Sequence, residues 1–285
     1  MIPYGRGEQP WLDAACDPKR PLTLHSYRPG SHQPGSPVVL VQHGMGRNGD
    51  EYRDFWIEAA DKHGLLILAT TFGKAAWPEA EHYNNGLVLD DAGNPRPRDA
   101  WAYPIPLRVF AQVRAAGVTT RAKAHVFGHS AGGQFVHRMM ATQPHDAVEA
   151  VTIGNPGWYT LPRFDLAFPA GMSGIGLGEA ELGALVAFPM TILAGALDVE
   201  TAGPSLPSQP AAIAQGPHRF ARAHNYIAEG RAAAERLGIT CPWHLVPVPG
   251  VGHDGAAMSR VAAALWFENR LITAEEAGAV AAGAL

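Results

Sequence analysis

The chain has 285 residues, of which 47% are apolar and 17% are charged, and its formal net charge is −4. This balance is typical of a water-soluble globular protein and leaves no basic surface that would point to nucleic acid or to an acidic membrane. The composition therefore predicts neither a nucleic-acid partner nor a membrane partner. The length fits a single α/β domain over residues 1–285.

The amino terminus and the cysteines bear on the cellular compartment. Residues 1–21 lack the apolar core of a secretory signal peptide, and no apolar stretch reaches the ~20 residues that span a bilayer. The two cysteines, Cys16 and Cys241, are too few for a disulfide framework or a cysteine-rich metal site. We expect a cytoplasmic protein unless a leader has been removed, and the oligomeric state stays open.

Short apolar runs alternate with helical patterns along the chain. The predicted strands are Leu22–Tyr27, Pro37–Gln42, Leu65–Thr70, Ala124–Gly128, Ala147–Gly154, Met190–Gly195 and Trp243–Gly250. The predicted helices are Glu51–Lys62, Ile105–Ala116, Gly132–Thr142, Arg219–Leu237 and Ala256–Asn269. This alternation is typical of a mostly parallel sheet covered by helices. The last strand contains two prolines, which cannot donate to a ladder, so we expect it at or near a sheet edge.

Two long insertions, 73–103 and 155–189, interrupt this rhythm. Long ordered loops in compact domains often form lids or binding loops, although irregular surface packing is the alternative. We therefore take both insertions as candidate substrate-binding loops. Their aromatic residues Tyr83, Trp158 and Tyr159 are candidate substrate-binding side chains.

A serine flanked by glycines lies between a predicted strand and a predicted helix. Ser130 stands between Gly128 and Gly132 in the sequence GHSAG. Packing alone could require small residues at such a joint. The same strand–turn–helix context is that of a nucleophile elbow, in which a sharp turn presents the serine hydroxyl. We therefore predict that Ser130 is a nucleophile.

A serine nucleophile needs a base, and the base needs an orienting carboxylate. Asp198 follows a strongly apolar run, and His253 lies in a glycine-rich loop after the last predicted strand, so both follow Ser130 in the expected order. Glu200 is the fallback for the acid, and Asp165 fits less well because it lies in an insertion. The neighbour of the serine, His129, is expected to pack beneath the turn.

An oxyanion hole needs two backbone N–H groups that face the developing charge. We assign one to Ala131, directly after the nucleophile, and one to Met45, in the loop after an early strand. His43, in the same loop, is expected to brace it and is also counted among the candidate substrate-binding residues.

Four segments together resemble one family. The segments QHGMGRNGDEY, GHSAGG, GALD and GVGHD are similar to the oxyanion loop, elbow, acid loop and histidine loop of α/β-hydrolases. Within that superfamily the chain resembles the esterase group that includes polyhydroxybutyrate depolymerases and feruloyl esterases. The resemblance implies an α/β-hydrolase fold and a serine hydrolase that cleaves carboxylic esters through an acyl-enzyme, without a cofactor. Polyesters and esters of hydroxyacids are then the candidate substrates.

Several other functions could use parts of the same pattern. A peptidase, a thioesterase and an acyltransferase would use the same three residues, and the sequence does not separate them from an esterase. A non-catalytic binding module on this scaffold would usually lack one of the three residues. The histidines show no metal-binding spacing such as H-E-x-x-H, and the one G-x-G-like string lacks the acidic residue that dinucleotide binding requires.

Overall fold

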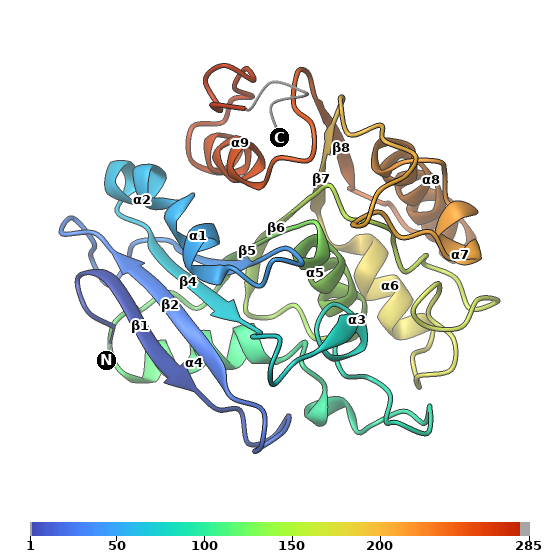
Figure 1. Cartoon of the computed structure of the whole chain (residues 1–285), viewed down its shortest axis with the longest axis horizontal. Helices are drawn as coiled ribbons and strands as arrows, with labels where there is room; N and C mark the ends of the chain where they lie inside the picture. The colour runs from blue at the N-terminus through green and yellow to red at the C-terminus, as the bar shows by residue number, and fades with distance from the viewer. Residues whose placement is uncertain (1, 280–285) are drawn as a thin grey trace.

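The computed structural model describes residues 2–279 and is built around one eight-stranded sheet (Figure 1). The spatial order of the strands is β1-β2-β4-β3-β5-β6-β7-β8. The pairs β1–β2 and β2–β4 are antiparallel, and every other neighbouring pair, β3 included, is parallel. The strands are β1 Gly5–Trp11, β2 Leu22–Arg28, β3 Val38–Gln42, β4 Leu66–Thr71, β5 Ala124–His129, β6 Val148–Gly154, β7 Met190–Gly195 and β8 His244–Val248.

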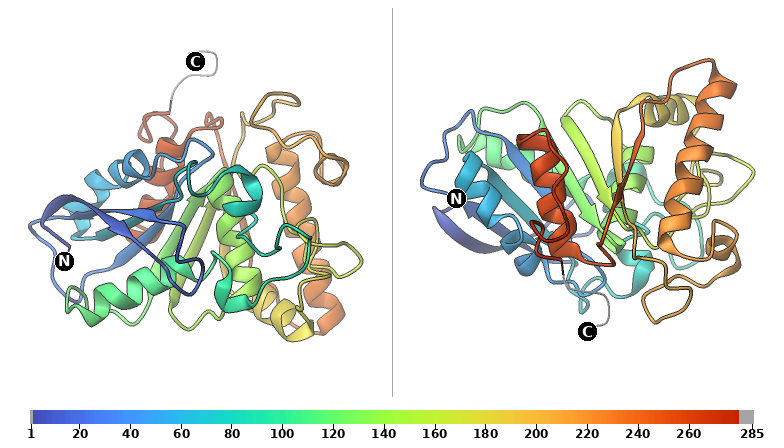
Figure 2. Two further views of the ribbon diagram at one scale, coloured as in Figure 1. Left: turned by 60° about the horizontal axis from the view of Figure 1, so that its bottom comes forward. Right: turned by 90° about the horizontal axis from the view of Figure 1, so that it is seen from above.

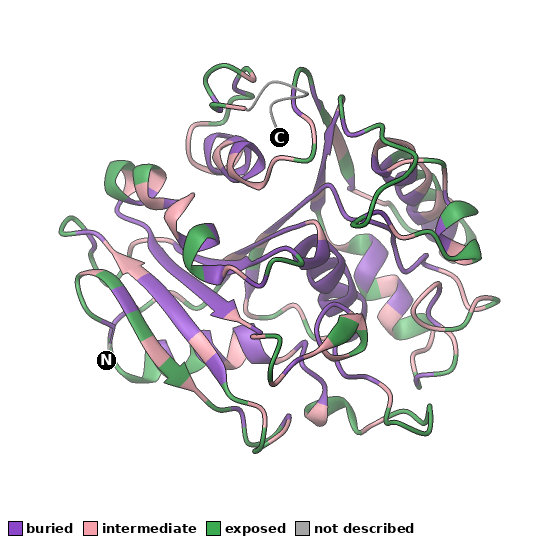
Figure 3. Cartoon of the chain, in the orientation of Figure 1, coloured by how far each residue is buried: buried purple, intermediate pink, exposed green. Residues whose placement is uncertain are grey.

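Helices cover both faces of the sheet (Figures 1 and 2). They are α1 Gly49–Asp54, α2 Ile57–His63, α3 Glu79–His82, α4 Ile105–Ala115, α5 Ala131–Thr142, α6 Glu179–Ala187, α7 Pro210–Ile213, α8 Arg219–Leu237 and α9 Gly255–Phe267, with a 3₁₀ turn at Arg98–Ala100. Successive strand side chains point to opposite faces. Val39 and Val41 thus belong to the hydrophobic cluster that includes α1, α2 and α9, whereas Val38 and Leu40 belong to the cluster that includes α4, α5, α6 and α8. The central strands and α5 are buried as a result (Figure 3).

Each predicted strand is present, and the proline-containing β8 lies at the sheet edge as expected. The strand β1 was not predicted, because its sequence GRGEQPW has no apolar alternation. Backbone hydrogen bonds to β2, rather than burial of its side chains, hold this edge strand in the sheet. The predicted helix Glu51–Lys62 is two helices, α1 and α2, which are separated at the buried Trp56.

The two insertions are more ordered than loops. The segment 73–103 contains α3 and the 3₁₀ turn, and 155–189 contains α6. The four aromatic side chains of the first insertion are almost fully buried in the large hydrophobic cluster: Trp77, Tyr83, Trp101 and Tyr103. These rings pin the insertion to the sheet core, so it is a fixed part of the domain surface.

Within residues 2–279, no helix combines the length and the apolar character that crossing a bilayer requires. The thiols of Cys16 and Cys241 are both free.

Candidate active site

The turn between β5 and α5 holds Ser130 in a strained backbone conformation, with φ 58° and ψ −118°. A non-glycine residue rarely adopts a positive φ, and such strain persists only where the surrounding structure enforces it. The flanking glycines are required by contact. A Cβ on Gly128 would collide with the Gly132 carbonyl, and a Cβ on Gly132 would collide with the carbonyl of Gln42. Close packing therefore explains the two glycines, and the sharp turn that this packing allows places the Ser130 hydroxyl at the site.

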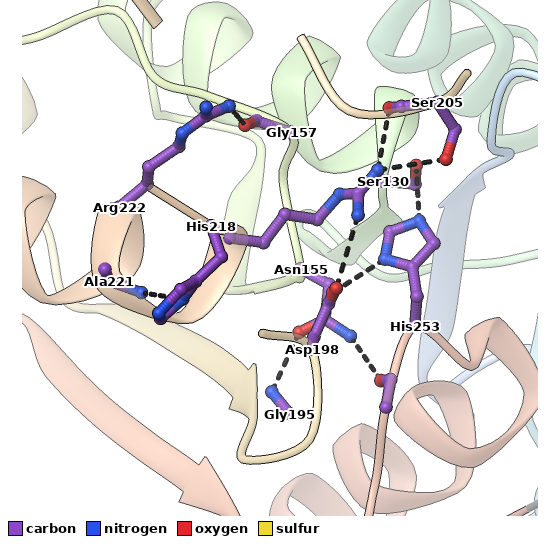
Figure 4. Close-up of polar contacts among 12 residues, drawn as sticks. Ser130, Asn155, Gly157, Gly195, Asp198, Ser205, His218, Ala221, Arg222 and His253 are labelled. Atoms are coloured by element: carbon purple, nitrogen blue, oxygen red, sulfur yellow. Dashed lines mark hydrogen bonds and ion pairs between the residues drawn. The ribbon is translucent and has the colours of Figure 1, made fainter. Parts of the chain in front are cut away.

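The structure brings Ser130, His253 and Asp198 together, although they lie far apart in the sequence (Figure 4). Ser130 Oγ lies 3.0 Å from Nε2 of His253, and Nδ1 of His253 lies 2.7 Å from Oδ2 of Asp198. All three residues follow the carboxyl ends of parallel strands, namely β5, β7 and β8. That edge is where open α/β sheets place their sites.

These distances determine the tautomer of the imidazole. A carboxylate can only accept, so Nδ1 of His253 carries the proton and donates to Asp198, which leaves Nε2 of the neutral ring as an acceptor for the Ser130 hydroxyl. The arrangement can activate a serine for attack on a carbonyl carbon. Asp198 is buried, whereas the side chain of His253 is 28% exposed and can reach a substrate.

A buried arginine on α8 holds the other oxygen of the acid. Arg219 Nη1 lies 3.2 Å from Oδ1 of Asp198, and Nη2 donates to the Ser205 carbonyl at 2.7 Å. Both charged side chains are only 2% exposed. A buried charge requires a partner, and the ion pair fixes the rotation of the carboxylate so that Oδ2 faces His253. No sequence signal marked Arg219, because its contact crosses from the start of a helix to a distant loop.

Asn155, directly after β6, was also not singled out from the sequence. Its side-chain amide donates to the Gly252 carbonyl at 2.9 Å, and its Oδ1 accepts from the Gly195 amide at 2.8 Å (Figure 4). It therefore joins the loop that carries the acid to the loop that carries His253. Its place at the carboxyl end of a parallel strand, with a polar side chain, is a signal that could have found it.

The amides of Met45 and Ala131 flank the serine from two loops. Met45 follows β3, and Ala131 begins α5. Neither amide donates to another residue in the part of the chain that the structure describes. A Cβ on Gly44 would lie 3.7 Å from Cβ of Ser130 and 3.0 Å from the Tyr52 hydroxyl, so this loop passes close to the nucleophile. The free N–H groups are suited to binding an oxyanion.

His43 supports that loop from below. Its Nδ1 donates to the Gly44 carbonyl at 2.8 Å, and its Nε2 accepts from the Phe72 amide at 3.0 Å. Burial lowers the pKa of His43 to about 3, so the ring is neutral. The Tyr83 hydroxyl donates to the His43 carbonyl at 2.6 Å, and the two rings lie 4.5 Å apart. The bracing role expected for His43 agrees with these contacts.

His129 lies under the site, as expected. Its Nδ1 is 2.8 Å from the Tyr52 hydroxyl, and its ring centroid is 4.8 Å from that of His253. Burial, and then the charges of His253 and Arg219, hold the pKa of His129 well below its ordinary value. A neutral ring is therefore packed against the candidate base.

A cleft of about 960 Å³ begins at Met45. Three parts of the chain form its walls: α3 together with the segment that follows it, Trp158, and the loop 204–209. Of the candidate substrate-binding residues, Trp158 lines this cleft. His43, Tyr83 and Tyr159 do not, because all three side chains are fully buried, and the expectation that they contact substrate is corrected. Sequence patterns show that an aromatic residue lies in a loop, but not what covers it.

The alternative acids lie elsewhere. Glu200 is exposed, and the carboxylate at Nδ1 of His253 is that of Asp198; Asp165 is paired with Arg163 at the surface. Asp165 also lines a separate cavity of about 640 Å³ between α6 and α8, which contains none of the residues around Ser130.

Comparison with known proteins finds similar solved structures. No family model matches the chain, and no curated protein matches it either. The chain is 54% identical to the poly(3-hydroxybutyrate) depolymerase LpqC from Bordetella parapertussis, over 96% of this chain and 93% of that one, with a TM-score of 0.93. It is 34% identical to poly(aspartic acid) hydrolase-1 from Sphingomonas sp. KT-1, over 93% and 99% of the two chains, with a TM-score of 0.87. An S-formylglutathione hydrolase from Agrobacterium tumefaciens shares the fold at 16% identity and a TM-score of 0.56.

Proposed function

The chain belongs to the α/β-hydrolase serine esterases, and we propose that it hydrolyses polyesters and oligoesters of hydroxyacids through an acyl-enzyme on Ser130. It is a carboxylic ester hydrolase, as the family implies. The peptidase, thioesterase and acyltransferase alternatives are not favoured, because the relative at 54% identity is named for a polyester.

The reaction follows from the contacts around Ser130. Nε2 of His253 takes the hydroxyl proton as Ser130 attacks the ester carbonyl, and Asp198 stabilises the imidazolium that forms. The amides of Met45 and Ala131 hold the oxyanion of the tetrahedral intermediate. The alcohol leaves with the proton from His253, which then activates water to release the acid from Ser130. Arg219 keeps the carboxylate of Asp198 oriented throughout.

The cleft is the single observation that carries the choice of an oligomeric ester. It starts beside the proposed oxyanion amide of Met45, and its volume of about 960 Å³ is at the upper end of the range for drug-sized ligands. Its walls carry apolar side chains from three segments of the chain: Leu87, Val88, Leu89, Trp158, Phe168 and Leu206. A cleft of this volume and apolar character suits several linked ester units better than a single acetyl group.

The test compares substrates of increasing length. We expect kcat/KM for methyl-capped 3-hydroxybutyrate oligomers to rise from dimer to tetramer and to exceed the value for the corresponding monomer ester. Chromatography and mass spectrometry of the products give the rates, and poly(aspartic acid) serves as the comparison polymer. Failure to cleave any oligomer, by an enzyme that still cleaves small activated esters, would overturn the proposal.

The oxyanion assignment makes a separate prediction. A backbone donor at Met45 survives substitution of its side chain, so Met45→Ala should keep kcat within about tenfold and should change mainly KM. At Gly44 a valine would crowd both the Tyr52 hydroxyl and Ser130, which displaces the loop. Gly44→Val should therefore approach the loss of roughly 10²–10³ in kcat that removal of one oxyanion donor causes.

Both variants are assayed on one activated ester, with circular dichroism to check folding. An equal loss of kcat in folded Met45→Ala and Gly44→Val would mean that the Met45 backbone amide is not the donor.

A further inference from the structure

The charged side chains that line the cleft are almost all acidic. Glu79 and Glu81 of α3, with Asp90 and Asp91 after it, line the cleft and are exposed. No lysine or arginine lines it, and His82 is its one basic residue among those described. A cleft with charges of one sign and low-dielectric walls concentrates that potential on whatever enters it.

The charges of these carboxylates are not offset by close ion pairs. Within residues 2–279, none of the four forms an ion pair. Asp90 accepts from the amides of Ala92 and Asn94 at 3.0 and 2.8 Å, and backbone hydrogen bonds of this kind lower the pKa of Asp90. Three buried arginines lie behind the lining without being part of it: Arg47 donates to the carbonyl of Glu79, Arg138 donates to Asn85 Oδ1 at 2.8 Å, and Arg219 donates to the Ser205 carbonyl at 2.7 Å.

A buried polar group of the cleft has the same preference. Asn84 lines the cleft and is only 3% exposed, and its Nδ2 donates to Gln134 Oε1 at 3.0 Å. Its Oδ1 has no hydrogen-bond partner. A buried acceptor without a partner costs free energy, and a donating group such as a hydroxyl would relieve that cost if Asn84 turned its Oδ1 toward the cleft. A carboxylate cannot donate, so it would leave this acceptor without a partner.

The position of the cleft indicates which part of an ester it holds. Met45, whose amide faces the carbonyl oxygen in the proposed reaction, lines the cleft, whereas His253, which protonates the departing alcohol, does not. A substrate whose acyl part extends past Met45 into the cleft would leave its alcohol part on the side of His253. In an oligomer of a hydroxyacid, the free end of the acyl part is a hydroxyl.

We propose that this cleft is an acyl-chain subsite that admits chains ending in a hydroxyl or another neutral group and excludes chains ending in a carboxylate. The inference rests on the proposed function, and it goes further by giving the cleft a charge preference and a direction. The polyester then enters with its hydroxyl end in the cleft, so that the end carrying the free carboxylate lies on the leaving-group side.

The experiment uses three chromogenic esters with one leaving group, 4-nitrophenol, and acyl chains of equal length. The chains end in a hydroxyl, a methyl ester or a carboxylate, and each rate is divided by the rate of alkaline hydrolysis of the same ester. At low ionic strength we expect kcat/KM for the neutral chains to exceed that for the carboxylate chain by about tenfold or more, and added salt to shrink this ratio.

A variant with three neutral replacements tests the residues themselves. Glu79→Gln, Glu81→Gln and Asp91→Asn together should reduce the ratio to roughly twofold, and Asp90 is kept because it orders its own turn. The matched control is Glu58→Gln, Glu235→Gln and Asp146→Asn, which makes the same change of charge at exposed positions outside the cleft and should leave the ratio unchanged.

The outcomes separate the two proposals. Equal hydrolysis of the carboxylate chain and the hydroxyl chain at low salt overturns the charge preference, even if polyesters are cleaved. If the preference for neutral chains survives the triple replacement in the cleft, these carboxylates do not cause it. The same conclusion follows if the control triple also removes the preference. Absence of cleavage of every neutral ester and oligomer is instead a failure of the proposed function.

Discussion

Ser130→Ala is expected to lower kcat for ester hydrolysis by about 10⁴-fold or more, because removal of the nucleophile leaves only binding and the oxyanion donors. The melting temperature should change little, since alanine keeps the strained backbone at φ 58° and removes one hydroxyl from a half-buried position. The measurement is kcat on an activated ester together with thermal unfolding.

The matched control is Ser31→Ala, an exposed serine in the loop that precedes β3, at the opposite edge of the sheet. It should keep full activity. A fluorophosphonate should label the wild-type chain once, on the peptide that contains Ser130. Labelling of another residue, or wild-type activity in Ser130→Ala, would show that the nucleophile is elsewhere.

His253→Ala should be nearly as damaging as Ser130→Ala, and the double variant should be no worse than either, because the residues act as one unit. The imidazole is partly exposed and carries no buried charge, so this variant is expected to fold. The kcat values of the two single variants and the double variant on one ester provide the check. Additive losses in the double variant would contradict a shared step.

Asp198→Asn should also be severe, because an amide at this position favours the wrong tautomer of His253. It carries a second cost that His253→Ala does not. Arg219 would keep its charge in a buried site without a counter-charge, and breaking a buried pair in this way typically costs ~3–5 kcal/mol. We therefore expect a lower melting temperature as well as a lower kcat.

Glu200→Gln is the control for the acid, since Glu200 is exposed and two residues away from Asp198. It should keep both the activity and the melting temperature of the wild type. If Glu200→Gln lost more kcat than folded Asp198→Asn, the acid would have to be reassigned.

Much of the fold and the three central residues could be predicted from the sequence because their signals are local. Alternating apolar runs mark the strands, and glycines at −2 and +2 are required wherever a strand turns sharply into a helix. Polar residues directly after apolar runs lie at the carboxyl edge of a parallel sheet, which is how Asp198 and His253 were selected. The mostly parallel sheet predicted on this basis is present, and the α/β-hydrolase fold that the family resemblance implied is confirmed by the relatives.

The tertiary structure alone decided the features that depend on contacts between distant segments. The ion pair of Arg219 with Asp198, and the Asn155 link between two loops, join positions that no short pattern connects. The strand β1 depends on backbone pairing with β2, which any sequence can form without a side-chain signal. Whether an aromatic residue meets substrate depends on what packs over it. For this reason the sequence by itself determined the order of the reacting groups, whereas only the folded chain showed that Tyr83 and Tyr159 support the site from within and that acidic residues line the cleft.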